Sequence, residues 1–203
     1  MLEHIHRIVH DCFRIDGPVV IYTDPFHLPD GLPRADLVLI SHDHYDHCSP
    51  EDLAKLAKPD TVYVAIEACR KALAKLPGKV QVVKPGDRLE VKGVAIQAVP
   101  AYNVDKKFHP RAAGHVGYIF TAHGKRLYFA GDTDHIPEMR SFQVDVALLP
   151  VSGTYVMTAE EAVAAAADLH PEVTIPMHYG EIVGDPGDAA RFQKLNPGRS
   201  VIK

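Results

Sequence analysis

Residues 37 to 48 read LVLISHDHYDHC, an apolar run followed at once by a segment rich in histidine and aspartate. The apolar run is typical of a strand covered on both faces, so the polar segment begins at the carboxyl end of a buried strand. Ligands of α/β folds bind at such strand ends. His42 and His44 alternate by two, which turns both rings to one side of an extended backbone, and Asp46 and His47 follow past a bend. Imidazole and carboxylate suit Zn²⁺, Fe²⁺ or Mn²⁺, so this segment predicts a metal site.

Matching donors stand at the ends of other apolar runs. Asp132 follows RLYFAG, and His178 follows VTIPM. The run VAIQAVP opens into a loop that holds His109 and His115. Either histidine could supply a further imidazole. We expect His109, because it lies within a flexible loop, whereas His115 adjoins the strand-like run VGYIFT.

The composition is that of an ordinary globular protein. The chain has 203 residues, of which 46% are hydrophobic and 24% charged. Strand and helix signals mix along the chain without a linker, which predicts a single α/β domain over residues 1–203. The net charge of −4 argues against a strongly basic nucleic-acid surface.

The N-terminal residues and the cysteines favour a cytoplasmic protein. Charged side chains interrupt every apolar stretch near the N-terminus, which is unlike a signal peptide. No apolar run is long enough to span a membrane. Three cysteines at wide spacings suit a reducing compartment, and Cys48 reads as a small buried residue rather than a nucleophile. The oligomeric state stays open.

Secondary-structure signals alternate along the chain. Apolar runs predict strands within residues 5–15, 19–24, 37–41, 61–65, 80–83, 94–99, 116–121, 126–131, 145–150 and 173–177. Capping residues, helix-breaking prolines and apolar spacing predict helices at 50–58, 67–76, 158–170 and 188–195.

An ordered series of motifs resembles the metallo-β-lactamase fold family. The series is Asp24 in YTDP, the HxHxDH block at 42–47, Asp132 in AGDT and His178 in PMHYG. The resemblance covers about residues 5 to 180, and it is closest to compact metal-dependent hydrolases related to ascorbate-6-phosphate lactonase. It implies a four-layer αβ/βα sandwich with the site at the shared edge of two sheets.

The resemblance also implies two divalent metal ions, of which Zn²⁺ is expected first and Mn²⁺ or Fe²⁺ are alternatives. The implied ligands of one ion are His42, His44 and a third histidine, here His109, and those of the other are Asp46, His47 and His178. Asp132 would bridge both ions, and Asp24 would brace the histidine-rich loop. The family usually has glycine where this chain has Val9, which leaves the role of His10 open.

The implied function is a metal-dependent hydrolase. A metal-bound hydroxide would attack a small, anionic ester, lactone, amide or phosphodiester, with Asp46 and Asp132 orienting and neutralising charge. The alternatives are a nuclease of the same fold, an iron-dependent oxidoreductase and a weakly metal-binding, non-catalytic protein.

A further set of residues is expected to contact the substrate. Lys106, Lys107 and Arg111 would engage an anionic group, with a merely solvated loop as the alternative. Tyr102, Asn103 and Tyr155 would line the pocket. Tyr179 and His10 are candidates for the acid that protonates the leaving group.

Overall fold

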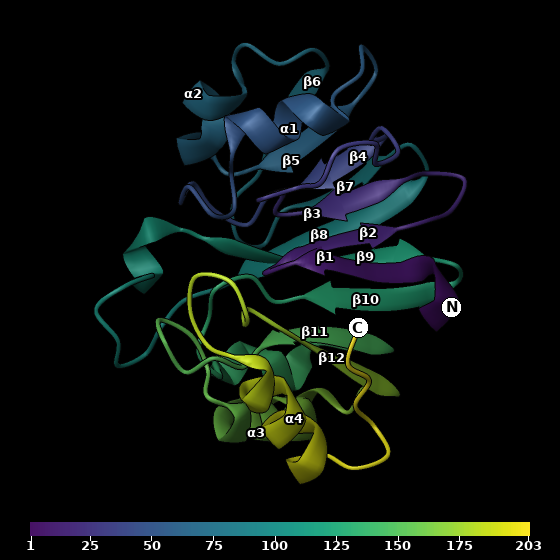
Figure 1. Ribbon diagram of the computed structural model, residues 1–203. Coiled ribbons are helices and arrows are strands. Elements are labelled where there is room, and N and C mark those ends of the chain that lie inside the picture. The colour runs from purple at the N-terminus through teal and green to yellow at the C-terminus, as the bar shows by residue number, and fades with distance from the viewer.

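The computed structural model describes residues 1–203, whose strands form two six-stranded sheets (Figure 1). The first sheet, in spatial order, contains β1 (Ile5–Val9), β2 (Cys12–Ile15), β3 (Ile21–Thr23), β4 (Leu37–Leu39), β5 (Val62–Ala65) and β6 (Lys79–Val82). The second sheet contains β12 (Val173–Met177), β11 (Val146–Pro150), β10 (Lys125–Phe129), β9 (Val116–Ala122), β8 (Val94–Pro100) and β7 (Arg88–Val91).

Both sheets combine antiparallel and parallel pairs. In the first sheet β1 to β3 pair antiparallel and β3 to β6 pair parallel. In the second sheet β7 to β10 pair antiparallel and β10 to β12 pair parallel. Parallel neighbours end at the same edge of a sheet, so the loops after β3, β4, β10, β11 and β12 share an edge with their neighbours.

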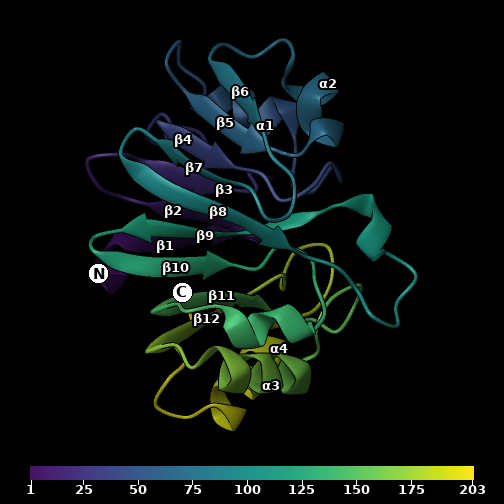
Figure 2. The same cartoon turned by 180° about the vertical axis from the view of Figure 1, so that it is seen from behind.

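Helices flank the sheets. The α-helices are α1 (Pro50–Leu56), α2 (Arg70–Leu73), α3 (Ala159–Leu169) and α4 (Pro186–Leu195). Short 3₁₀ helices lie at Leu2–His4, Glu67–Cys69, Arg111–Ala113 and Pro137–Ser141. The pair α1 and α2 lies beside the first sheet, and α3 and α4 lie beside the second (Figures 1 and 2). The predicted αβ/βα sandwich is confirmed.

The helix ends follow the capping signals in the sequence. Ser49 accepts a hydrogen bond from the Asp52 amide at the start of α1, and Thr158 and Glu161 form a capping box on α3. The helix expected at 67–76 is shorter and is a 3₁₀ turn followed by α2. By contrast, α4 begins before the expected position, because Asp185 caps it.

Two strand predictions differ from the structure. The run at 5–15 is not one strand: β1 and β2 form a hairpin in which Val9 pairs with Cys12. His10, with a φ of 48°, and Asp11 make the turn, which places both at the edge of the sheet. The second difference is β7, which was not predicted. Its four residues, RLEV, alternate between exposed charged side chains and apolar ones, so no continuous apolar run marks the strand.

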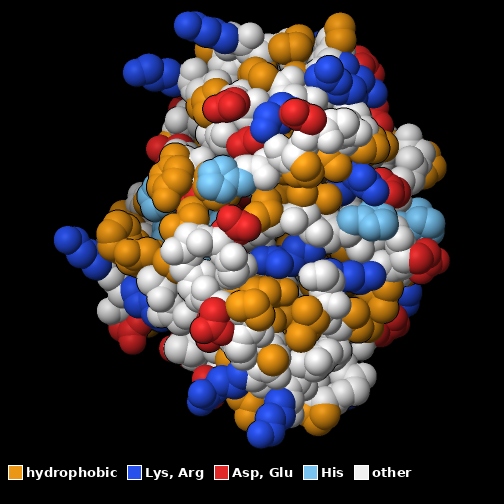
Figure 3. Space-filling view, viewed as in Figure 1, with side chains coloured by type: hydrophobic (Ala, Val, Ile, Leu, Met, Phe, Trp, Pro, Cys, Tyr) orange, Lys and Arg blue, Asp and Glu red, His pale blue; other side chains and the backbone are white.

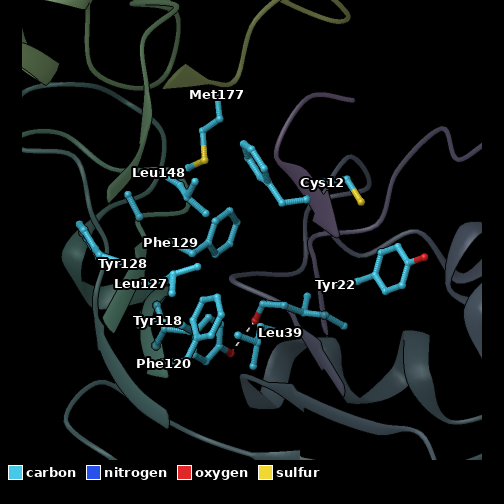
Figure 4. Close-up of a cluster of buried hydrophobic side chains, with 14 of the residues drawn as sticks. Cys12, Tyr22, Leu39, Tyr118, Phe120, Leu127, Tyr128, Phe129, Leu148 and Met177 are labelled. Atoms are coloured by element: carbon cyan, nitrogen blue, oxygen red, sulfur yellow. Dashed lines mark hydrogen bonds between the residues drawn. The ribbon is translucent and has the colours of Figure 1, made fainter. Parts of the chain in front are cut away.

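The core lies between the sheets. Leu37–Leu39 are fully buried, and Figure 4 shows Leu39 next to Tyr118 and Phe120 of the opposite sheet. The Tyr118 hydroxyl donates a hydrogen bond of 2.7 Å to the Ile40 carbonyl, and thereby joins the two sheets just before the histidine-rich segment. The three cysteines are free and buried. No helix has both the length and the apolar character that crossing a membrane requires.

Candidate metal centre

Buried polar side chains from both sheets converge at one edge of the sandwich. His42 follows β4 of the first sheet, while Asp132 and His178 follow β10 and β12 of the second. His10 and Asp24 follow β1 and β3. All five are buried, although each carries a polar side chain. Such burial indicates that these side chains serve one another or a bound ligand.

The Asp132 carboxylate is the centre of the cluster. Four imidazoles aim their Nε2 atoms at it, at distances of 3.9 Å for His42, 3.5 Å for His47, 3.3 Å for His109 and 3.4 Å for His178. The two carboxylate oxygens divide these contacts, since His47 faces Oδ1 and the other three face Oδ2. A carboxylate with a free lone pair on each oxygen can bridge two cations.

The opposite ring nitrogen of each of these histidines is already engaged. The Nδ1 partners are Ser41 Oγ at 2.8 Å for His42, Asp24 Oδ2 at 2.7 Å for His47, the Tyr155 carbonyl at 3.2 Å for His109 and Ser152 Oγ at 2.9 Å for His178. The Asp24 and Tyr155 oxygens can only accept, so the Nδ1 atoms of His47 and His109 carry the hydrogen. The Nε2 lone pairs of those two rings are therefore directed into the cluster, as in metal-bound histidines.

Three ring nitrogens form a compact group on one side of Asp132. His44 Nδ1 lies 2.9 Å from His42 Nε2 and 3.1 Å from His109 Nε2. Ligands of a tetrahedral zinc ion lie about 3.3 Å apart, so this spacing is close to that of a loaded site. His115 lies next to the group: its ring stacks at 4.7 Å on that of His42, one of its ring nitrogens lies within 4.8 Å of donor atoms of His42 and His109, and its Nδ1 is buried without a partner.

A second group lies on the other side of Asp132. Asp46 Oδ2 is 3.6 Å from His47 Nε2 and 3.5 Å from His10 Nε2. The His178 ring lies 4.2 Å from that of His10. One donor atom from each of these four residues lies within 4.8 Å of the others. The structure thus brings His10 to the centre, where the sequence left its role open.

Proton affinities in the centre diverge with the local charge. Burial lowers the pKa of His42 well below its ordinary value. Burial alone would also lower the pKa of His47, but the Asp132, Asp24 and Asp46 carboxylates raise it well above. Burial works against ionisation of Asp132, yet the neighbouring His178 and His47 hold its pKa well below the usual range. The carboxylates around His47 therefore favour a positive charge beside its ring, which a bound metal ion would supply in place of a proton.

The donor set fits divalent metal ions. The Nε2 of His47 and the Oδ1 of Asp132 are buried without hydrogen-bond partners. Asp11, Asp24 and Asp132 are buried carboxylates, and no lysine or arginine pairs with them. A dication supplies the missing partner for both atoms and neutralises the carboxylates, and the all-nitrogen-and-oxygen set suits zinc, manganese or iron.

Two residues of the centre were missed from the sequence. Asp11 is fully buried with both oxygens unbonded, and its Oδ2 lies 4.0 Å from His47 Nδ1. Burial raises its pKa. Ser152, just past β11, holds the His178 ring. The signal for Ser152 was its position directly after an apolar run, which alone is too common to single it out, whereas Asp11 lies inside the run at 5–15.

A cavity of about 430 Å³ opens onto the centre and tests the predicted substrate contacts. Of these residues only Tyr155 lines it. Tyr102 is buried, and its hydroxyl donates a hydrogen bond to Glu138. Its ring lies under the Arg111 guanidinium, and it does not line the cavity. Asn103 instead donates to the carbonyls of Tyr155 and Phe108. It thereby positions the loop that carries His109 rather than the substrate.

The remaining predicted contacts also lie elsewhere. Tyr179 is buried, with the Arg7 guanidinium 3.9 Å above its ring, and it does not line the cavity. Lys106 pairs with Asp134, and Lys107 is exposed outside the cavity lining. Arg111 pairs with Glu138 and does not line the cavity either. The sequence could not reveal these acidic partners, which lie far along the chain.

Comparisons with known proteins agree with this geometry. The profile of the beta-lactamase superfamily domain matches residues 4–178. A UPF0173 metal-dependent hydrolase of Pyrococcus abyssi is 31% identical over 216 residues, covering 95% of this chain and 96% of the relative. That of Thermoplasma acidophilum is 30% identical over 199 residues, covering 92% and 87%.

Solved structures agree as well. A crystal structure from Parabacteroides distasonis, of a protein assigned as a metal-dependent hydrolase, has a TM-score of 0.86 and 36% identity and covers 98% of this chain and 91% of that one. The metallo hydrolase Igni18 of Ignicoccus hospitalis has a TM-score of 0.77 and 25% identity, covering 98% and 94%. The narrower likeness to ascorbate-6-phosphate lactonase stays a prediction. By its matching profile, its relatives and its fold, the chain belongs to the beta-lactamase superfamily as a metal-dependent hydrolase.

Proposed function

We propose that the centre holds two divalent metal ions and hydrolyses a small carbonyl or phosphoryl compound. The supporting observation is the ring of four imidazoles, each with Nδ1 engaged and Nε2 directed at Asp132. His47 Nε2 is buried without a hydrogen-bond partner, as in a ring held ready for a metal ion, whereas a purely structural cluster would pair it.

The proposed ligands fall into two sets that share Asp132. The first set is His42, His44 and His109, and the second is Asp46, His47 and His178. His109 is assigned in preference to His115 because His109 Nε2 lies 3.3 Å from Asp132, whereas His115 stacks on His42. Zn²⁺ is the expected ion, and Mn²⁺ or Fe²⁺ would suit the same donors.

Bound divalent ions would supply Lewis-acid polarisation of the substrate and activation of water at neutral pH. The protein's own part is to fix the donors. Asp24, Ser152 and the Tyr155 carbonyl hold three imidazoles, so little reorganisation is needed during reaction. His10 is fully buried and does not line the cavity, and its Nε2 lies 3.5 Å from Asp46 Oδ2, so its proposed part is to position the Asp46 carboxylate.

Metal analysis combined with paired histidine variants tests the proposal. Protein loaded with Zn²⁺ and then desalted should retain two ions per chain. His109→Ala should retain one, and Asp132→Asn should bind both weakly and lose hydrolytic activity. His115→Ala is the matched control, since it removes a neighbouring imidazole and should keep both ions.

Three outcomes would contradict parts of this reading. Loss of an ion in His115→Ala with retention in His109→Ala would reverse the assignment of the third imidazole. Full activity in Asp132→Asn would refute the shared carboxylate. Iron that co-purifies and cycles between oxidation states with oxygen, without hydrolysis, would favour the oxidoreductase alternative.

A further inference from the structure

The cavity above the centre has two chemically different walls. Half of its lining residues are polar members of the centre, and the other half are apolar: Tyr45, Phe108, Tyr155, Ile182 and Val183. No lysine or arginine lines it. An apolar wall next to a few convergent polar groups is typical of sites for small molecules. We call these five side chains the apolar wall.

The apolar wall gathers most of the exposed large hydrophobic side chains of the protein. Seven such side chains are exposed, and four belong to the wall. The exposed fractions are 67% for Tyr45, 44% for Tyr155, 43% for Phe108 and 39% for Ile182. Figure 3 shows hydrophobic side chains gathered beside a histidine at the left of the molecule, in the view of Figure 1. Single exposed hydrophobes are ordinary, but a cluster at a cavity indicates a surface that a ligand covers.

Lys106 and Arg111, two of the three cations near His109, pair with acidic side chains, and the third, Lys107, is exposed and does not line the cavity. Lys106 pairs with Asp134, which is 5% exposed. Arg111 donates to Glu138 at 3.0 Å and stacks over a buried tyrosine. Binding of a carboxylate or phosphate needs a cation aimed at the ligand, and the wall provides none. No side-chain cation of the cavity lining would therefore bind a charged group that the substrate carries away from the reacting bond.

The loops that carry Phe108 and Tyr155 of the wall also position the centre. Tyr155 has a φ of 67°, a left-handed conformation that non-glycine residues adopt at a cost. Its carbonyl is held by Asn103 Nδ2 at 2.5 Å and by His109 Nδ1 at 3.2 Å. Its ring lies edge-on to Phe108, with 4.7 Å between centroids. One set of bonds thus fixes both the imidazole and the aromatic wall.

We propose that the enzyme selects uncharged carboxylic esters whose acyl group is an alkyl chain or aromatic ring, and that the apolar wall binds this group. The inference rests on the proposed hydrolytic function. Water adds its hydroxyl to the acyl carbon, the bond from that carbon to the alcohol oxygen breaks, and the second proton of water passes to the departing alcohol. The anionic substrate expected from the sequence is replaced by a neutral one.

A pair of esters equal in chain length isolates the effect of charge. We would compare p-nitrophenyl pentanoate with mono-p-nitrophenyl glutarate, which differs by a terminal carboxylate. The Zn²⁺-loaded enzyme should favour the pentanoate by at least tenfold in kcat/KM. Each methylene from acetate to pentanoate should add about fourfold to kcat/KM, because each is buried against the wall.

Variants of the wall separate packing from chemistry. Phe108→Ala should lower kcat/KM for the pentanoate about tenfold and leave that for the acetate nearly unchanged. Val104→Ala is the matched control, because Val104 is 66% exposed on the same loop and does not line the cavity. It should behave as the unmodified enzyme with both esters. Metal content should be equal in all three proteins.

The outcomes distinguish the substrate inference from the proposed function. Equal rates for the two esters, or an unchanged preference in Phe108→Ala, would overturn the inference. The inference would also be overturned if the only effect of Phe108→Ala were the dissociation of a dimer, because the wall would then be an interface between two copies of the chain. If protein that retains both ions hydrolyses no ester, the ester inference fails, and calorimetry with pentananilide and glutaric acid monoanilide then tests the wall alone: tighter binding of the uncharged anilide supports an apolar, uncharged ligand, and equal or reversed affinities refute it. If the protein retains no ions, the proposed function fails.

Discussion

Replacement of Asp24 by asparagine should weaken one metal site and spare the other. Asp24 accepts three hydrogen bonds: from the Ser41 amide at 2.7 Å, the Ser41 hydroxyl at 2.5 Å and His47 Nδ1 at 2.7 Å. An asparagine offers one accepting oxygen. If that oxygen faces Ser41, its amide group faces His47 Nδ1, the ring takes the other tautomer, and Nε2 loses the lone pair that a metal needs.

The opposite orientation of the new amide is also unfavourable. The oxygen then keeps His47, but the amide group faces the donating Ser41 amide, and a buried donor is left unsatisfied at about 1–3 kcal/mol. Loss of a residue that holds a metal-ligating histidine costs 10- to 100-fold in metal affinity, or about 1.4–2.7 kcal/mol. We therefore expect the affinity of the second ion to fall by this factor in Asp24→Asn.

Competition with a chelator of known zinc affinity measures both sites. Asp36→Asn serves as the control, because Asp36 also accepts a backbone amide, from Val20 at 2.8 Å, but at the start of β4 and not at its end. Circular dichroism should show that both variants are folded. Two unchanged zinc affinities in Asp24→Asn would refute the role of Asp24, and equal weakening in Asp36→Asn would show that general destabilisation is the cause.

Two further predictions concern stability. Gly117→Ala should destabilise the protein by about 1–3 kcal/mol in urea unfolding, because an added Cβ would lie 2.7 Å from the Ala130 carbonyl oxygen, and an unchanged midpoint would contradict the close approach of β9 and β10. Burial opposes ionisation of Asp52, but bonds from Leu28, Ser49 and Lys55 hold its pKa below the ordinary value, so its stabilising effect is present above about pH 4 and is lost as the pH falls through the folded-state pKa. The difference in unfolding free energy between the metal-free protein and Asp52→Asn should therefore shrink between pH 6 and pH 3, and a difference independent of pH would contradict this.

The sequence was informative where a local pattern decides the structure. Within LVLIS, Leu37–Leu39 form β4, all five residues are fully buried, and the capping residues at Ser49 and Thr158 begin helices where expected. The ends of apolar runs also predicted which polar side chains meet at the centre. This works because a buried strand fixes the direction of the chain and places the next residues at the edge of the sheet.

Prediction failed where a long-range partner decides. Lys106 is turned from the cavity by Asp134, and nothing near Lys106 in sequence announces that pair. Asp11 was overlooked because the run at 5–15 reads as one strand, although a two-residue turn interrupts it. The apolar wall combines side chains from separate loops, and its character depends on how those loops pack rather than on any motif.

The meeting of the two sheets at the centre has a mechanical consequence. His42 and His47 belong to the loop after β4 in the first sheet, while Asp132 and His178 belong to the second. Metal ions shared between them would clamp the sandwich along one edge, adding about 4 kcal/mol to stability when free metal is a thousandfold above the dissociation constant. Opening of the clamped edge would then require release of the ions, so resistance of the sandwich to unfolding would rise and fall with the supply of free metal.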